Sequence, residues 1–188
     1  MIRILVASAT RHGATAEIAA EIADVLRRDV AGAVVDLRDA AKAGDVAAHD
    51  AAVIGSAVYL GRWLPAARNL VEGHREVFSA MPVWLFSSGP LGDPPVPADG
   101  PAEVVALGVA VGARGHRLFA GRLDRQELRW VERATTRVVH APEGDFRDHD
   151  EIRQWASGVA SALTAGSQAA PVSGASRGVR PAMEEWNG

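Results

Sequence analysis

The sequence predicts an α/β fold in which a doubly wound, five-stranded parallel sheet of order 2-1-3-4-5 carries helices on both faces. Short, almost wholly apolar runs of strand length alternate along the chain with longer segments in which apolar residues recur at helical spacing. Strands that alternate with helices pair in parallel, because each helix returns the chain to the edge where the last strand began. The 188 residues are enough for one domain with a full core.

The predicted strands and helices alternate along the chain. We expect strands at Ile2–Ala7, Ala33–Leu37, Ala51–Gly55, Val83–Ser87 and Arg117–Gly121. We expect helices at residues 14–28, 65–79, 102–113, 125–138 and 149–164. In the first helix Ile18, Ile22 and Val25 share one face. The link between the second and third strands is short and has room for only a turn or two of helix.

The last predicted helix has a clear start and a clear apolar face. Asp148 and Glu151 have the spacing of a capping box, with Asp in the role that Ser or Thr usually takes. Ile152, Trp155 and Val159 form an apolar stripe, so we expect Trp155 in the core and not at a ligand. The acidic residues around this helix start are explained by the helix dipole, which favours negative charge there.

The loop Ser8–Thr15 leads from the first strand directly into a helix. Such a loop points several backbone N–H groups and the positive end of a helix dipole at one place, and its hydroxyl groups add donors, so it suits a phosphate group. Standard nucleotide motifs do not fit, because Lys42 is the only lysine and only Gly13 of a Gly-x-Gly-x-x-Gly pattern is present. An ordinary strand-to-helix turn stays open as the alternative.

Two further loops are expected beside the first, because ligands of doubly wound folds lie beyond the carboxyl ends of the strands. The loop Ser56–Trp63 carries Tyr59 and Trp63, which can cover a flat ring, and the Leu60–Gly61 peptide can contact its edge. Packing of Trp63 in the core at the start of the next helix is an equal alternative. The loop Ser87–Asp93 is small and hydroxyl-bearing, so its backbone can approach a ligand edge closely.

Composition and charge argue against nucleic acid binding, cysteine chemistry and a histidine metal site. The net charge of −3 is mild and gives no argument for nucleic acid binding. The absence of cysteine excludes disulfides, thiolate catalysis and iron–sulfur clusters, and the six histidines show no metal-ligand spacing.

No signal peptide and no membrane span is visible, so we expect a cytoplasmic protein without stable membrane insertion. Residues 165–188, rich in Ala, Ser, Gly and Pro, are expected to form a flexible tail.

Four segments together resemble the flavodoxin superfamily. They are the opening loop, the Gly61-centred loop, Phe119–Asp124 and Gly144–Trp155. The chain is most similar to the branch of menaquinone-dependent protoporphyrinogen oxidases and related flavodoxin-domain proteins. Quinone-linked members insert an apolar, basic segment before the last helix, whereas Gln126–Gly144 reads here as an amphipathic surface helix. This departure argues against membrane contact and quinone reduction.

The resemblance implies a flavodoxin-like domain over residues 1–164 with FMN as its cofactor. It implies phosphate contacts from Ser8, Thr10, Arg11, His12, Gly13, Ala14 and Thr15. It implies contacts to the isoalloxazine ring from Val58, Tyr59, Leu60, Gly61, Trp63, Ser87, Ser88, Gly89 and Pro90. No metal site is expected, and no side chain is singled out as catalytic.

The function that we expect is FMN-dependent electron or hydride transfer by an oxidoreductase, for which protoporphyrinogen oxidase-like activity is one candidate. A non-enzymatic electron carrier and a flavin- or deazaflavin-binding module stay open, as does an NAD(P)H-dependent reductase. Arg11 and Arg62 in the ring loops favour a small-molecule redox substrate over a redox protein partner. A homodimer also stays open. A phosphoacceptor receiver domain is excluded, because Ser8 and Ser56 stand where it needs acidic residues.

Overall fold

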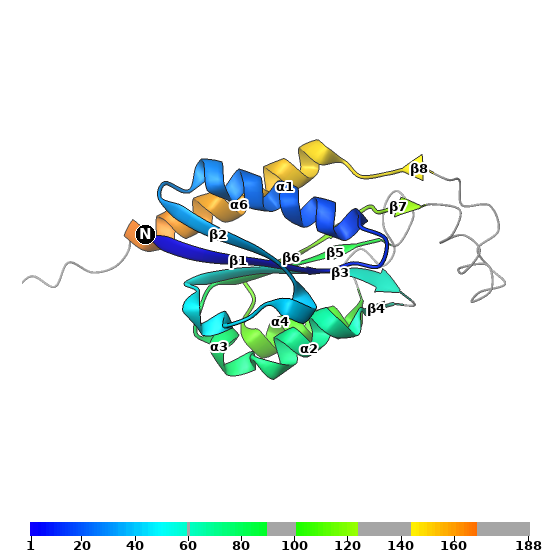
Figure 1. The fold of residues 1–188 in the computed structure, drawn as a ribbon, viewed down its shortest axis with the longest axis horizontal. Helices are drawn as coiled ribbons and strands as arrows, with labels where there is room; N and C mark the ends of the chain where they lie inside the picture. The colour runs from blue at the N-terminus through cyan, green and yellow to red at the C-terminus, as the bar shows by residue number, and fades with distance from the viewer. Residues whose placement is uncertain (60, 90–100, 124–143, 169–188) are drawn as a thin grey trace, which may run out of the picture.

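The computed structural model describes residues 1–59, 61–89, 101–123 and 144–168. Its main sheet holds five parallel strands in the order β2-β1-β3-β5-β6 (Figure 1). These strands are β1 (Ile2–Ala9), β2 (Ala33–Asp39), β3 (Ala51–Tyr59), β5 (Val83–Ser88) and β6 (Gly115–Phe119). They correspond in order and place to the five predicted strands, so the predicted fold class is confirmed. A short sixth strand, β4 (Arg62–Trp63), folds back onto the end of β3 as an antiparallel hairpin.

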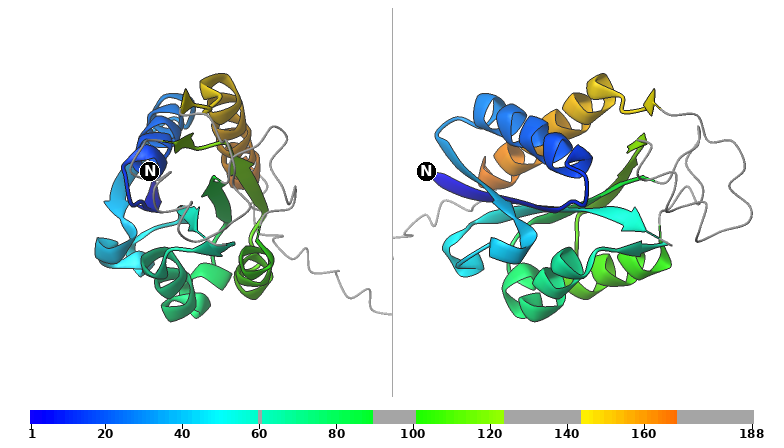
Figure 2. Two further views of the ribbon diagram at one scale, coloured as in Figure 1. Left: turned by 90° about the vertical axis from the view of Figure 1, so that its right-hand side faces the viewer. Right: turned by 45° about the vertical axis from the view of Figure 1, so that its right-hand side comes forward.

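Helices cover both faces of the sheet. Figures 1 and 2 show α1 (Ala14–Asp29) and α6 (His149–Gln168) on one face and α2 (Pro65–Gly73), α3 (Arg75–Ser79) and α4 (Ala102–Val111) on the other. Each strand therefore buries side chains on both sides, which explains why the strand sequences are almost continuously apolar. Because helices cover both faces, a ligand site is expected at an end of the sheet, and the carboxyl ends of all five strands lie at the same end.

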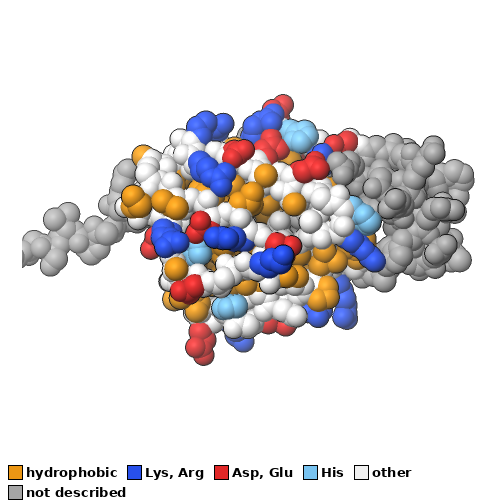
Figure 3. Space-filling view, in the orientation of Figure 1, with side chains coloured by type: hydrophobic (Ala, Val, Ile, Leu, Met, Phe, Trp, Pro, Cys, Tyr) orange, Lys and Arg blue, Asp and Glu red, His pale blue; other side chains and the backbone are white. Residues whose placement is uncertain are grey.

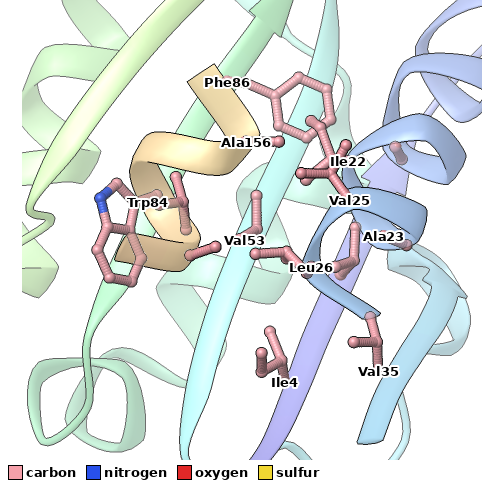
Figure 4. Packing of buried hydrophobic residues seen from close by; sticks show 14 of the residues in the cluster. Ile4, Ile22, Ala23, Val25, Leu26, Val35, Val53, Trp84, Phe86 and Ala156 are labelled. Atoms are coloured by element: carbon pink, nitrogen blue, oxygen red, sulfur yellow. The ribbon is translucent and has the colours of Figure 1, made fainter. Parts of the chain in front are cut away.

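The core has two halves, one on each side of the sheet, because successive residues of a strand point to opposite faces. Ile4, Val53 and Phe86 pack against α1 and α6, as Figure 4 shows from close by. Leu5 and Leu85 belong to the other half, under α2 and α4. Both halves are closed to solvent, so the sheet is a rigid support for the loops at its carboxyl end.

Two predicted connections differ in detail from the structure. The segment 65–79 forms two helices and not one, because the backbone at His74 (φ −120°, ψ 27°) leaves helical geometry between α2 and α3. The link between β2 and β3 forms two 3₁₀ turns, whose amides at Ala41 and Ala47 donate to the side chains of Asp39 and Asp45. The predicted helix 125–138 lies outside the described residues.

The chain reaches α6 through a small second sheet. Strands β7 (Arg122–Leu123) and β8 (Gly144–Asp145) pair antiparallel. The predicted cap then follows, because Asp148 Oδ1 accepts the N–H of Glu151 at 2.9 Å. Trp155 packs edge-on against Phe119, with 5.7 Å between ring centroids, and is partly buried against the core, so it lies at the edge of the core and not wholly inside it as predicted. Helix α6 ends at Gln168, and the remaining segment, 169–188, lies outside the described residues.

The surface is mixed in charge. Figure 3 shows side chains of both signs lying close together across the face that it presents, with small groups of hydrophobic side chains between them. Arg3 and Asp36, on β1 and β2, form one such pair at 3.2 Å. Within the described part of the chain, no helix combines the length and the apolar character that crossing a membrane requires.

Candidate functional site

The three predicted loops meet at the carboxyl end of the sheet. Strand pairing places Ala9 beside Ser56 and Ser56 beside Ser87, so the ends of β1, β3 and β5 lie next to one another. The first and second loops also touch through their side chains, because the guanidinium of Arg11 lies over the ring of Tyr59, with 5.4 Å from Cζ to the centroid. The sequence therefore placed these loops correctly relative to one another.

The first loop connects β1 to α1 through residues 10–13. Thr10 Oγ1 accepts the N–H of Gly13 at 2.9 Å, and this bond closes the loop on itself. Gly13 has a φ of +90°, a left-handed conformation that is costly for other residues. The first helical bond within the described residues runs from Glu17 N–H to the carbonyl of Gly13 at 3.0 Å. The N–H groups of Ala14–Ala16 accordingly face the loop without an acceptor inside the helix.

This helix start has the features of an anion site. The residue at its cap is Gly13, which has no side chain that could accept a hydrogen bond from these N–H groups. The positive end of the α1 dipole therefore points at the concave side of the loop. The Thr10 hydroxyl, which accepts from Gly13, still carries a hydrogen that it can donate to a ligand.

The other predicted phosphate residues surround this loop at different depths. Ser8, at the end of β1, and Thr15, in the first turn of α1, are both buried, with 4% and 1% of their surface exposed. His12 and Ala14 are half-buried, and Arg11 is exposed at the loop tip. Buried hydroxyls at the base and a cation at the rim are a suitable surrounding for a phosphate dianion.

The second loop is shorter than the sequence suggested, because β3 continues through Tyr59. Val58 pairs with Trp63 and Tyr59 with Arg62, so the chain reverses direction between Tyr59 and Arg62. Gly61 has a φ of +73°, which such a tight turn requires. Tyr59 is half-buried and Arg62 is exposed. Leu60, predicted to offer its peptide to the ring, lies outside the described residues.

Trp63 lies in the core half under α2 and α4, with only 2% of its surface exposed. Its indole Nε1–H donates to Ser87 Oγ at 2.8 Å, and its backbone N–H donates to Glu103 Oε2 at 3.1 Å. This placement matches the core alternative for Trp63 and leaves Tyr59 as the aromatic side chain of this loop with exposed surface. Ser56 is likewise internal, since Leu64 N–H donates to its hydroxyl at 2.9 Å.

The third loop begins at the end of β5 and lies against the chain that leaves β6. Ser88 is 5% exposed, and the N–H of Gly89 donates to the carbonyl of Phe119 at 3.0 Å. A Cβ at Gly121 would lie 3.3 Å from the nitrogen of Gly89, so the two backbones are in close contact. Ser87 is fully buried and bonds to Trp63, which turns its hydroxyl away from the loop surface. Pro90 lies outside the described residues.

One neighbour of the first loop was not predicted from the sequence. Arg147, between β8 and α6, donates to both Asp145 oxygens and, through Nη1, to Glu17 Oε2 at 2.6 Å. Only 5% of its side chain is exposed. The hydrogen bonds from Arg147 lower the pKa of Asp145 to about 2, and the same pair raises the pKa of Arg147. The only sequence signal was an arginine inside the acidic run before α6.

The remaining acidic residues near α6 are held by local partners. Asp150 pairs with Arg153 at 2.6 Å, and Glu151 pairs with Arg117. Among the described residues there is no group of three or more histidine, aspartate or glutamate side chains arranged to hold a metal ion. In the described residues, the carboxyl end of the sheet therefore combines a helix start whose first N–H groups lack helical acceptors with an aromatic side chain and several backbone edges.

Comparison with known proteins agrees with this geometry. The model of the flavodoxin domain family matches residues 5–150. No curated protein matches the chain. Solved structures share the fold at identities so low that the likeness shows the fold alone. Rubredoxin:oxygen oxidoreductase from Desulfovibrio gigas superposes with a TM-score of 0.61 at 13% identity, over 89% of this chain but only 37% of that one.

Single-domain flavodoxins superpose along their whole length. A flavodoxin variant from Pseudomonas aeruginosa gives a TM-score of 0.59 at 14% identity, over 87% of this chain and 99% of its own. A flavodoxin from the domain Archaea gives 0.55 at 11% identity with the same coverage. The family match covers well over half of the chain. The chain therefore belongs to the flavodoxin domain family, whose work is flavin-based electron transfer, and its cofactor is FMN.

Proposed function

We propose that FMN binds at the carboxyl ends of β1, β3 and β5 with its phosphate in the Thr10–Thr15 loop. The observation that carries this proposal is the start of α1, where N–H groups without helical acceptors, the Thr10 hydroxyl and the dipole converge. FMN fits these residues chemically, because a terminal phosphate needs several donors and the loop offers donors with no carboxylate of its own. Arg11 at the rim adds a positive charge.

The isoalloxazine ring is proposed to lie between the second and third loops. Tyr59 supports this, since it is half-buried, stands next to the phosphate loop and contacts Arg11. Val58, Gly61, Ser88 and Gly89 would offer backbone edges and small surfaces beside it. Leu60 and Pro90 remain proposed ring contacts from the sequence. Trp63 and Ser87 act beneath the ring, as the buried support of the turn that carries Tyr59.

When bound, FMN supplies the capacity to accept and release electrons or a hydride. The residues of this chain hold the phosphate, cover one side of the ring and set the polarity around it. Their rigidity matters, because β1, β3 and β5 are buried on both faces and fix the relative positions of the three loops.

We propose that the partner in electron transfer is a small, anionic redox substrate. Within the segments 8–15, 58–63 and 87–89, the ionisable side chains other than His12 and Tyr59 are those of Arg11 and Arg62, and both are exposed. Such a rim attracts anions. A porphyrinogen, which carries carboxylates, is the candidate that the sequence resemblance names. A redox protein with an acidic surface is the second candidate, because the same two arginines would meet it.

The experiment is to purify the protein without added cofactor, record its absorbance spectrum and identify the released chromophore by mass. The expected result is a flavin spectrum and the mass of FMN. Anaerobic reduction followed by mixing with small anionic oxidants and, separately, with acidic redox proteins then separates the two partner classes by which of them reacts. Arg11→Gln with Arg62→Gln should slow anionic reactants of either class and leave neutral ones unchanged. A chromophore other than FMN, or no binding of added FMN, contradicts the proposal.

A further inference from the structure

We infer that Arg147 is a positioning residue that fixes the carboxylate of Glu17 at the edge of the phosphate site and prevents it from turning onto the N–H groups there. This inference rests on the proposed binding of FMN phosphate at the start of α1. Glu17 lies in the first turn of α1, and its Oε1 would lie only 3.8 Å from a Cβ on Gly13. A carboxylate at this place can reach the helix start, where it would compete with the phosphate for the same N–H groups.

The contacts of Arg147 oppose that competition. Its Nη1 donates to Glu17 Oε2 at 2.6 Å, while Nε and Nη2 hold both oxygens of Asp145 at 2.8 and 2.6 Å. The guanidinium is thus fixed by a two-point bond to Asp145 on one side and binds Glu17 on the other. Only 5% of the Arg147 side chain is exposed, although 51% of Glu17 is. The anchored partner is the arginine, and the carboxylate is the group that it positions.

Charge gives a second reason for this role. A phosphate dianion next to a carboxylate is repelled, and the repulsion is strongest where water is partly excluded. Arg147 is shared between Asp145 and Glu17, so it offsets the charge of Glu17 in part, without itself standing in the loop. It comes from residues that follow β8, so it also ties the start of α6 to the start of α1.

A neighbouring pair supplies a matched control. Arg153, on α6, donates to Glu21 Oε1 at 2.6 Å, one turn further along α1. This pair has the same chemistry and also joins α6 to α1, but it stands away from the helix start. Loss of Arg153 should therefore affect the docking of the two helices and not the phosphate.

The test measures the affinity of apo protein for FMN and for riboflavin, which lacks the phosphate, by calorimetry. Arg147→Met should weaken FMN binding by about tenfold, the change that ~1.4 kcal/mol produces, and leave riboflavin binding unchanged. The double variant Glu17→Gln, Arg147→Met should recover the lost FMN affinity. Arg153→Met should change the affinity for neither FMN nor riboflavin. Where Arg147→Met is not folded, Arg147→Lys should show the same order of effects at smaller size.

The outcomes are distinguishable. Equal losses for FMN and riboflavin, or a loss that Glu17→Gln does not rescue, would show that Arg147 has only a structural role and would overturn the inference. The inference is also overturned if wild-type protein and Arg147→Met prefer FMN over riboflavin by the same factor. If wild-type protein binds no FMN, the proposed function fails and the inference falls with it.

Discussion

The indole N–H of Trp63 donates to the hydroxyl of Ser87 at 2.8 Å, and both side chains are buried beneath the loops that the cofactor needs. This bond joins the β3–β4 hairpin to the end of β5. Ser87 Oγ also lies 2.9 Å from Nε2 of His116, so its hydrogen can be donated to this nitrogen when the nitrogen carries no proton. These buried contacts of Trp63 and Ser87 thus hold the β3–β4 hairpin, which carries Tyr59, against β5 and β6.

Ser87→Ala should destabilise the protein by about 1–3 kcal/mol, because the buried N–H of Trp63 loses its acceptor. Chemical denaturation measures the loss, and tryptophan fluorescence reports any change around Trp63. Ser161→Ala is the control, since the Ser161 hydroxyl only donates to the Ser157 carbonyl on the surface of α6. Equal stability of Ser87→Ala and wild type would show that the bond does not hold the hairpin.

Gly55→Ala should be strongly destabilising. A Cβ at this position would lie 2.0 Å from Cζ of Phe86, whose ring is fully buried in the core. Relief of the overlap requires movement of the ring or of β3, at a cost of about 1–3 kcal/mol or more. Gly158→Ala is the matched control, because its Cβ would meet nothing within 4 Å on the exposed face of α6.

Gly158→Ala should raise the free energy of unfolding by about 0.5–1 kcal/mol, as expected when alanine replaces glycine inside a helix. Thermal and urea unfolding measure both variants. A Gly55→Ala protein as stable as wild type would mean that β3 and β5 are packed less tightly than the structure shows.

Tyr59→Ala should alter the flavin more than Tyr59→Phe does. Aromatic cover disfavours the anionic, fully reduced ring, so its loss should raise the potential of the second electron. It should also reduce the quenching of flavin fluorescence. Tyr59→Phe keeps the ring and its contact with Arg11 and should retain both properties. Flavin emission and potential unchanged in Tyr59→Ala would remove this loop from the ring site.

Asp145 should contribute to acid stability in a defined window. Because Arg147 lowers its pKa from 3.8 to about 2 in the folded protein, its contribution is present above pH 3.8 and is lost as the pH falls toward 2. The difference in unfolding free energy between wild type and Asp145→Asn should therefore be largest at about pH 5 and shrink between about pH 4 and 2. A difference that does not change with pH would contradict the ion pair.

Much of this architecture was predictable from the sequence, because the apolar runs and helical stripes are forced by burial. The parallel sheet and the packing of Trp155 against the core follow from those patterns. The strand order, and with it the meeting of the three loops, agrees with what a flavodoxin-like fold implies. The split of the helix at His74 was not predictable, since it depends on local backbone geometry. The burial of Trp63 was left as an even alternative, because its position in the chain does not reveal that Ser87 and Glu103 bind it.

The contact of Arg147 with Glu17 could not be predicted from the sequence for a similar reason. The two residues are 130 positions apart, and only the folded chain brings the residues after β8 to the start of α1. The sequence showed donors in the first loop but not the carboxylate that could compete for them.

Thr10→Val and Thr15→Val should each weaken FMN binding by about tenfold or more, the effect of losing one charge-assisted hydrogen bond. Thr10 is the sharper case, because valine also removes the acceptor for Gly13 N–H and so loosens the loop. Riboflavin binding should hardly change in either variant. Unchanged FMN affinity in both would exclude these two hydroxyls from the phosphate site.

The most direct measurement is a calorimetric titration of wild-type apo protein with FMN and, separately, with riboflavin. The start of α1 offers N–H groups and the Thr10 hydroxyl to a phosphate, and nothing in that loop is specific for the ring. We therefore predict one FMN per chain and an affinity at least about tenfold higher than for riboflavin. Equal affinities for the two ligands would contradict the phosphate site on which the proposed function rests.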